Sequence, residues 1–239
     1  MHITQMLGIL AVVFFAALFF MCFFREKLSH PIINPLFICV CAAFFFCWNY
    51  AMFERRGSNF HFMTLENISP YISTVILITP LMSKRLKEYA YCAIAFLWFG
   101  MFLALFVSPE VEYLFNYNQE AQFIHISEAA CHLLMALYGF YLILSNKVSL
   151  DFKSLGKALA FIYASVGLGV FLNYFFHQSF FGMNMHGKYA IYFLDIFESF
   201  EITLIAYIVG IFGTMVLGFI SGLFLDKCSR HPKSDTTNS

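Results

Sequence analysis

The chain has 239 residues, of which 61% are hydrophobic and only 12% are charged, and its mean hydropathy is +0.75. A soluble domain usually carries about a quarter of its residues as charged side chains, so this composition excludes an ordinary soluble globular protein. The formal net charge is zero, so global charge gives no reason to expect a nucleic-acid partner. The composition therefore predicts an integral membrane protein.

The first apolar run is expected to be a membrane span that is retained. No Lys or Arg precedes it, and the first positive charges, Arg25 and Lys27, follow it. A cleaved signal peptide has the opposite order, with its positive charges before the apolar run.

Seven segments are long and apolar enough to cross a bilayer, which takes roughly 20 predominantly apolar residues. In chain order they are residues 6–24, 33–53, 62–82, 89–109, 122–144, 155–176 and 202–225. In lipid the backbone must satisfy its own hydrogen bonds, so each segment is expected to be helical. The predicted fold is an all-α polytopic transmembrane bundle, in which residues 1–228 form one domain and residues 229–239 a polar tail.

Two of these segments contain residues that affect helix geometry. Pro70 and Pro80 are expected to kink the third span, because proline removes a backbone donor and clashes with the preceding turn. Gly218 and Gly222 form a GxxxG pattern in the last span, which predicts close contact with another helix.

The distribution of basic residues predicts the orientation. If the N-terminus lies outside, eleven of the fourteen Lys and Arg residues fall on the inner side, and the exceptions are Arg55, Arg56 and Lys188. This bias satisfies the positive-inside rule with an odd number of crossings. We therefore expect a multi-pass protein of the cell membrane with its C-terminus inside.

Polar residues gather near the outer ends of three spans. They are Glu66, Asn67 and Ser69 on the third span, His125, Glu128 and His132 on the fifth, and Asn173 on the sixth. Because polar groups within a membrane are costly, each is a candidate for a functional site. We expect them to line one pocket that faces outward.

The three residues of the fifth span form one stripe, since at 100° per residue they lie within about 60° of each other. His125 or Glu128 can orient the imidazole of His132, which can then act as a base. Three interpretations stay open. The stripe belongs to a catalytic site, it is a hydrogen-bond network that only holds the bundle together, or it supplies zinc ligands. Its spacing is not that of a metalloprotease motif, and no metal or cofactor is expected.

Ser69 is the candidate nucleophile and His132 the candidate base. Ser69 precedes Pro70, where the backbone ladder is loosened, and its hydroxyl can reach a base on a neighbouring helix. Asn67 or Asn173 would donate to an oxyanion. The alternative for Ser69 is a hydrogen bond back to the carbonyl four residues earlier, as serines in membrane helices often make.

Residues 93–208 resemble the bacterial YwaF-type family of small integral membrane proteins. The similar features are a span that ends in Pro109, the Phe123-Ile124 pair that leads to His132, and the Leu172-Asn173-Tyr174 end of a later span. They also include the turn Phe180-Phe181-Gly182-Met183-Asn184-Met185 before the final span.

This family is similar to eukaryotic membrane proteins that move acyl chains on phospholipids with a Cys on the third span and a His on the fifth. The resemblance matches the His to His132 and puts the Cys near Ser69. The sequence departs from the family there, because no Cys lies between Cys47 and Cys92. What the resemblance implies is an acyl-transfer site with serine in the place of cysteine.

Three functions are consistent with the sequence. The first is a phospholipid acyl-transfer or lipid-hydrolase enzyme whose partners are membrane lipids. The second is a membrane-embedded binding or transport subunit that takes a small molecule into the outer pocket and needs partner membrane subunits. The third is a non-catalytic assembly factor whose polar cluster only fixes helix packing.

Overall fold

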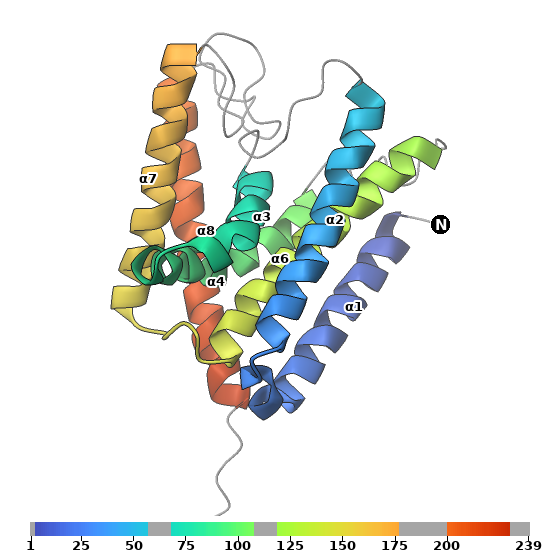
Figure 1. The fold of residues 1–239 in the computed structure, drawn as a ribbon, viewed down its shortest axis with the longest axis vertical. Coiled ribbons are helices and arrows are strands. Elements are labelled where there is room, and N and C mark those ends of the chain that lie inside the picture. The colour runs from blue at the N-terminus through green and yellow to red at the C-terminus, as the bar shows by residue number, and fades with distance from the viewer. Residues whose placement is uncertain (1–2, 57–67, 108–118, 177–199, 230–239) are drawn as a thin grey trace, which may run out of the picture.

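The computed structural model describes residues 3–56, 68–107, 119–176 and 200–229 (Figure 1). Within these ranges the regular structure is entirely helical, which confirms the all-α prediction. The α-helices are α1 (Ile3–Phe23), α2 (Ile33–Arg56), α3 (Ile68–Ile78), α4 (Lys84–Val107), α6 (Gln119–Leu144), α7 (Phe152–Phe176) and α8 (Phe200–Ser229). Two short 3₁₀-helices are η1 (Arg25–Ser29) and η4 (Thr79–Leu81).

The length and hydropathy of the helices agree with a membrane-embedded bundle. In the described part of the chain, α2, α4, α6, α7 and α8 each contain 19 or more residues that are apolar enough to cross a bilayer. Two other apolar helical segments, Ala11–Phe23 and Ile68–Leu81, are shorter than a full span. The orientation and the number of crossings stay predictions.

The third predicted segment differs from the expected continuous span. Its residues 62–67 lie outside the described ranges, and α3 ends at Ile78 with a 3₁₀ turn over Thr79–Leu81. The expected kink at Pro80 is wrong, because this residue lies in the 3₁₀ turn that follows the α-helix. Proline has no N–H to continue the ladder, so it terminates α3 instead of bending it.

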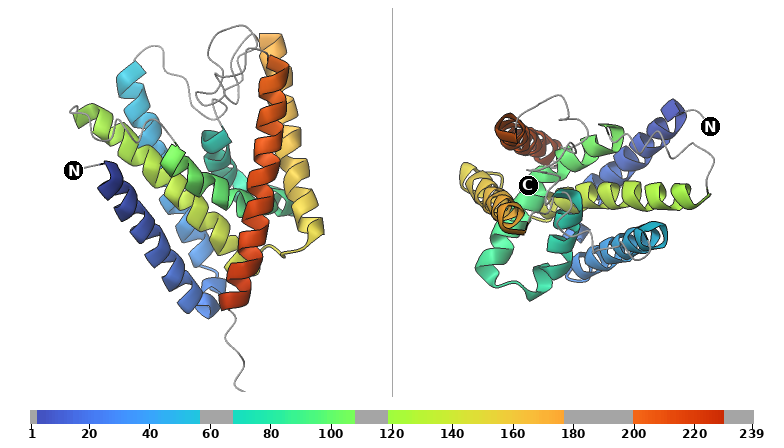
Figure 2. Two further views of the ribbon diagram at one scale, coloured as in Figure 1. Left: turned by 180° about the vertical axis from the view of Figure 1, so that it is seen from behind. Right: turned by 90° about the horizontal axis from the view of Figure 1, so that it is seen from above.

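The long helices form a bundle around one inclined helix. In Figure 1, α1, α3, α6 and α8 run downward, whereas α2 and α7 run upward. In contrast, α4 is strongly inclined and crosses the middle of the bundle, as the two views in Figure 2 show. It packs against α6, α7 and α8, so it forms the centre of the structure.

Two glycines allow α4 to approach its neighbours at backbone distance. A Cβ atom placed on Gly139 of α6 would lie 2.6 Å from the carbonyl oxygen of Ile94, and one on Gly218 of α8 would lie 2.1 Å from that of Phe96. The indole N–H of Trp98 donates to the Gly218 carbonyl at 3.1 Å. The close contact that the GxxxG pattern predicts is therefore present at Gly218.

At the lower end of the bundle, Arg25 joins three segments. Its guanidinium lies 2.5 Å from the Asp226 carboxylate of α8 and also donates to the Ser229 hydroxyl at 2.6 Å. A longer bond of 3.3 Å reaches Asn146 between α6 and α7. These contacts bring η1, the turn after α6 and the end of α8 together at one end of the molecule.

The N-terminus of α7 has a side-chain cap. Asp151 precedes the helix, and its carboxylate accepts hydrogen bonds from the Ser154 backbone N–H at 2.7 Å and from the Ser149 hydroxyl at 2.8 Å. Both bonds favour the charged carboxylate and so hold the pKa of Asp151 below its ordinary value, with the Ser154 amide as the larger cause.

We expect Gly218→Ala to lower the melting temperature of the purified protein. The new methyl would overlap the Phe96 carbonyl, and such overpacking costs about 1–3 kcal/mol. Gly213→Ala on the same helix is the control, because nothing lies within 4 Å of its added Cβ. There the better helix propensity of alanine is expected to stabilise the protein slightly. Equal melting temperatures for the two variants would contradict the close packing of α4 and α8.

We expect Asp151→Ala to cost about 0.5–2 kcal/mol, because the first turn of α7 loses its cap, while Asp151→Asn keeps most of it. The charge adds stability that is present above the unfolded pKa of aspartate and is lost as the pH falls through the lower pKa of the folded protein. The stability difference between wild type and Asp151→Asn should therefore shrink between about pH 6 and about pH 3. Thermal unfolding at a series of pH values measures it, and a constant difference would contradict the lowered pKa.

Candidate functional site

The candidate site lies where α3 packs against α6. Ser69 and Ser73 are one turn apart on α3, and they contact His132 and Met135 of α6 respectively. Tyr71 contacts a different neighbour, because its hydroxyl lies 2.6 Å from that of Ser165 on α7. Since the contacts of α3 and α6 advance together along both chains, these two helices run in the same direction. The helix α3 packs most extensively against α2, and side-chain hydrogen bonds join it to α6 and α7.

The structure brings together the two residues that the sequence suggested as a catalytic pair. The Ser69 hydroxyl oxygen lies 2.8 Å from Nε2 of His132, although the residues are 63 positions apart. Both are buried, each with a relative exposure of 6%. This hydroxyl bonds across helices, whereas those of Ser165 and Ser221 bond back to the carbonyl four residues earlier on their own helices.

The second ring nitrogen of His132 identifies the tautomer of the imidazole. Nδ1 lies 3.0 Å from the backbone carbonyl oxygen of Glu128, one turn earlier on α6. A carbonyl oxygen can only accept, so Nδ1 carries a proton in this contact. In a neutral ring, Nε2 is then unprotonated and accepts the hydrogen bond from the Ser69 hydroxyl. That is the arrangement in which a serine is ready to lose its proton to a histidine.

The imidazole is also enclosed by an aromatic side chain of α2. The ring centroids of Trp48 and His132 lie 6.2 Å apart, with the planes tilted by 53°. Trp48 is itself buried, as is Asn49 beside it, whose side-chain amide donates to the Phe45 carbonyl. Three helices, α2, α3 and α6, therefore surround the Ser69–His132 pair.

The other residues of the predicted pocket fall into three groups. Glu66 and Asn67 lie outside the described residues, and so does the side chain of His125. The Glu128 backbone carbonyl oxygen contacts Nδ1 of His132, and the pairing of the Glu128 carboxylate with the imidazole stays a prediction. Asn173 is fully buried on α7. Its part in the pocket stays a prediction.

Several contacts around the pair were not anticipated from the sequence. Trp48 stands out only as one of two tryptophans, and nothing in its local sequence links it to His132. Ser73 bonds to Met135 at 3.2 Å on the same face of α3 as Ser69, whereas Tyr71 bonds to Ser165 on the opposite face. The polar pattern at Ser69, Tyr71 and Ser73 was a signal that could have shown which two faces of this helix are partnered.

The described residues also bear on metal binding. Among them, no group of three or more His, Cys, Asp or Glu side chains is placed to hold a metal ion.

Comparison with known proteins adds no relative. No family model, no curated protein and no solved structure matches this chain. The functional interpretation thus depends on the geometry of the site and on the resemblance drawn from the sequence.

Proposed function

We propose that the protein is a membrane-embedded enzyme that transfers or hydrolyses a lipid acyl group, with Ser69 as the nucleophile and His132 as the base. The observation that carries the proposal is the 2.8 Å contact between the serine hydroxyl and Nε2, with Nδ1 held on a carbonyl. A hydrogen bond that served only to join two helices would be satisfied by either tautomer. The contact with the Glu128 carbonyl selects the one that can accept the serine proton.

The reaction follows from these atoms. The Ser69 oxygen attacks the ester carbonyl carbon of the lipid while its proton moves to Nε2 of His132. The tetrahedral intermediate collapses, the alkoxide of the departing alcohol takes that proton, and an acyl-serine remains. A second alcohol or a water molecule then attacks the acyl-serine carbonyl carbon while its proton moves to Nε2, and the bond to Ser69 breaks as the serine oxygen takes that proton back. The first choice is acyl transfer and the second is hydrolysis.

The group that orients the histidine is a backbone carbonyl, where a serine protease has a carboxylate. A carbonyl holds the ring in the correct tautomer. The aspartate of a catalytic triad has this role and also stabilises the imidazolium. Asn173 and Asn67 are the candidate donors to the oxyanion.

The membrane setting favours lipid as the substrate. The pair lies among helices that are apolar enough to be embedded in a bilayer, where ester-linked acyl chains are the abundant carbonyl compounds. The resemblance to the YwaF-type family, which is similar to lipid acyl-transfer proteins, supports the same substrate class. In this proposal a serine is the nucleophile, whereas those proteins use a cysteine.

Replacing Ser69 or His132 by Ala is expected to abolish lipid turnover while the protein stays folded. Loss of a general base alone lowers the rate by about 10²–10⁴-fold. Lipid profiles of cells that carry wild type, Ser69→Ala, His132→Ala or no protein measure the turnover. Labelling of purified protein with a fluorophosphonate, which reacts with activated serines, gives a direct readout of Ser69.

The matched control is Ser73→Ala. This serine lies one turn further along α3, is buried to a similar degree, and bonds to Met135 instead of His132. It should keep both turnover and labelling. Lipid profiles that are unchanged between wild type and both site variants, together with absent labelling of wild type, would exclude the enzyme and leave a hydrogen bond that only joins α3 to α6.

A further inference from the structure

We propose that the groove between α4 and α7 binds one anionic phospholipid, with an acyl chain along the groove and the headgroup on the lysines at its end. This site is separate from the Ser69–His132 pair, and the inference does not depend on the enzymatic proposal. It rests on the shape of the groove, the state of its polar groups and the charges beside it.

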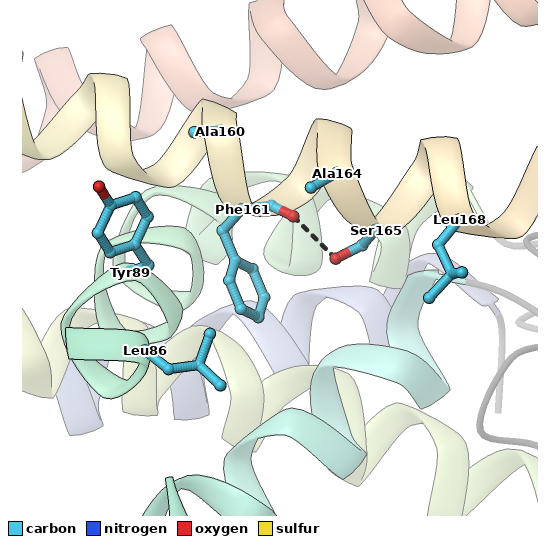
Figure 3. A pocket seen from close by; sticks show the side chains of 7 residues that line it. All are labelled: Leu86, Tyr89, Ala160, Phe161, Ala164, Ser165 and Leu168. Carbon is cyan, nitrogen blue, oxygen red and sulfur yellow. Dashed lines mark hydrogen bonds between the residues drawn. The ribbon is translucent and has the colours of Figure 1, made fainter. Parts of the chain in front are cut away.

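The groove is apolar and long. It has a volume of about 380 Å³ and is lined by two residues of α4 and five of α7, namely Leu86, Tyr89, Ala160, Phe161, Ala164, Ser165 and Leu168 (Figure 3). This volume lies at the lower end of the range for small-molecule sites, so it suits one chain and not a whole lipid. Ala160 and Ala164 leave the space open because they are small.

The serine hydroxyl in the groove already has hydrogen-bond partners within the protein. Its serine is Ser165, whose hydroxyl donates to the Phe161 carbonyl at 2.8 Å, as the dashed line in Figure 3 shows. The Tyr71 hydroxyl donates to the same serine oxygen at 2.6 Å. Because these bonds already use the hydroxyl, a hydrocarbon chain can cover it without leaving a donor unsatisfied.

One end of the groove is charged. In Figure 3 the hydroxyl of Tyr89 lies at the Ala160 end of the row, and Leu168 lies at the opposite end. Just beyond Ala160, on the preceding turn of α7, Lys157 forms an ion pair with Glu88 of α4. Glu88 also interacts electrostatically with Lys84 and Lys153.

The charges at this end are predominantly positive. The first two turns of α4 and α7 carry five cations, Lys84, Arg85, Lys87, Lys153 and Lys157. The anions near them are Glu88, which is paired with Lys157, and Asp151, which caps α7. Lys84, Arg85 and Lys153 are exposed. Clusters of this kind beside an apolar groove attract anionic headgroups, and a zwitterionic headgroup gains much less from them.

A lipid therefore accounts for both parts of the site together. A soluble anion would use the lysines and leave the groove empty, while a second protein helix would fill the groove without needing the cations. A phosphatidylglycerol-type lipid offers one negative charge attached to a chain, which is the combination that the two surfaces require. By the predicted orientation, this end of the bundle faces the inner leaflet.

The test compares two lipids with identical acyl chains, palmitoyl-oleoyl phosphatidylglycerol and palmitoyl-oleoyl phosphatidylcholine. The full chain is purified in a mild non-ionic detergent and mixed with either lipid, and native mass spectrometry counts the lipid that it retains. Thermal unfolding in the same samples reports stabilisation by binding. We expect phosphatidylglycerol to be retained preferentially and to raise the melting temperature.

Two variants separate the headgroup from the chain. Lys84→Ala combined with Lys153→Ala should weaken phosphatidylglycerol binding by about fivefold for each lysine. The matched charge control is Lys147→Ala with Lys227→Ala, two exposed lysines that lie outside the groove. Ala164→Leu should abolish retention by filling the groove, whereas Ala16→Leu, at an exposed position on α1, should not.

Three results would overturn the proposal. One is equal retention of the two lipids by wild type. Another is the same loss of binding in both double-lysine variants, which would indicate a general effect of net charge. The last is unchanged retention in Ala164→Leu, which would show that the lipid binds elsewhere.

Discussion

The contact of backbones at α4 is the constraint on which the rest of the structure depends. In a bilayer no hydrophobic force draws apolar helices together, so their association relies on close packing and on hydrogen bonds between them. Gly139 and Gly218 let α6 and α8 approach the backbone of α4 from two sides, and the Trp98 indole adds a hydrogen bond to one of these contacts. The helix α7 also packs on α4, while α1 and α2 pack on α6.

The Ser69–His132 pair is a consequence of that packing. The described helix α3 packs against α2, and side-chain hydrogen bonds join it to α6 and α7. Because α6 is anchored on α4 through Gly139, the imidazole of His132 has a defined place. Bonds at Ser69 and Ser73 then set the rotation of α3 about its own axis. A site built this way is preorganised, as acyl-transfer chemistry requires.

The two proposed sites differ in where their polar groups lie. The first has its polar groups inside the bundle, and the second has its charges at an exposed end. At the first site the Ser69 hydroxyl and Nε2 of His132 contact each other, and Nδ1 contacts a backbone carbonyl. At the α4–α7 groove the one serine is satisfied internally and the charges stay at the exposed end. In both cases the polar groups that are removed from water have partners, which is the condition for keeping them in an apolar bundle. Tyr71 and Ser165 connect the two regions through a single hydrogen bond.

The sequence by itself determined that the chain is helical and apolar enough for a membrane. Long apolar runs have one stable backbone form in lipid, so the helices at residues 33–53 and 122–144 were predictable without tertiary information. It also singled out Ser69, His132 and the GxxxG pattern at Gly218, because polar groups and small residues are conspicuous in an apolar helix.

Only the tertiary structure decided which faces meet. These helices are apolar on most sides, so their sequences do not specify how each is rotated about its axis or which neighbour it contacts. For that reason the close approach at Gly139, the position of Trp48 beside His132 and the contact of Nδ1 with the Glu128 carbonyl could not be predicted. The position of Pro80 in the sequence indicated that the helix would be disturbed there. Whether a proline bends a helix or ends it depends on the hydrogen bonds that neighbouring helices supply in place of the missing one.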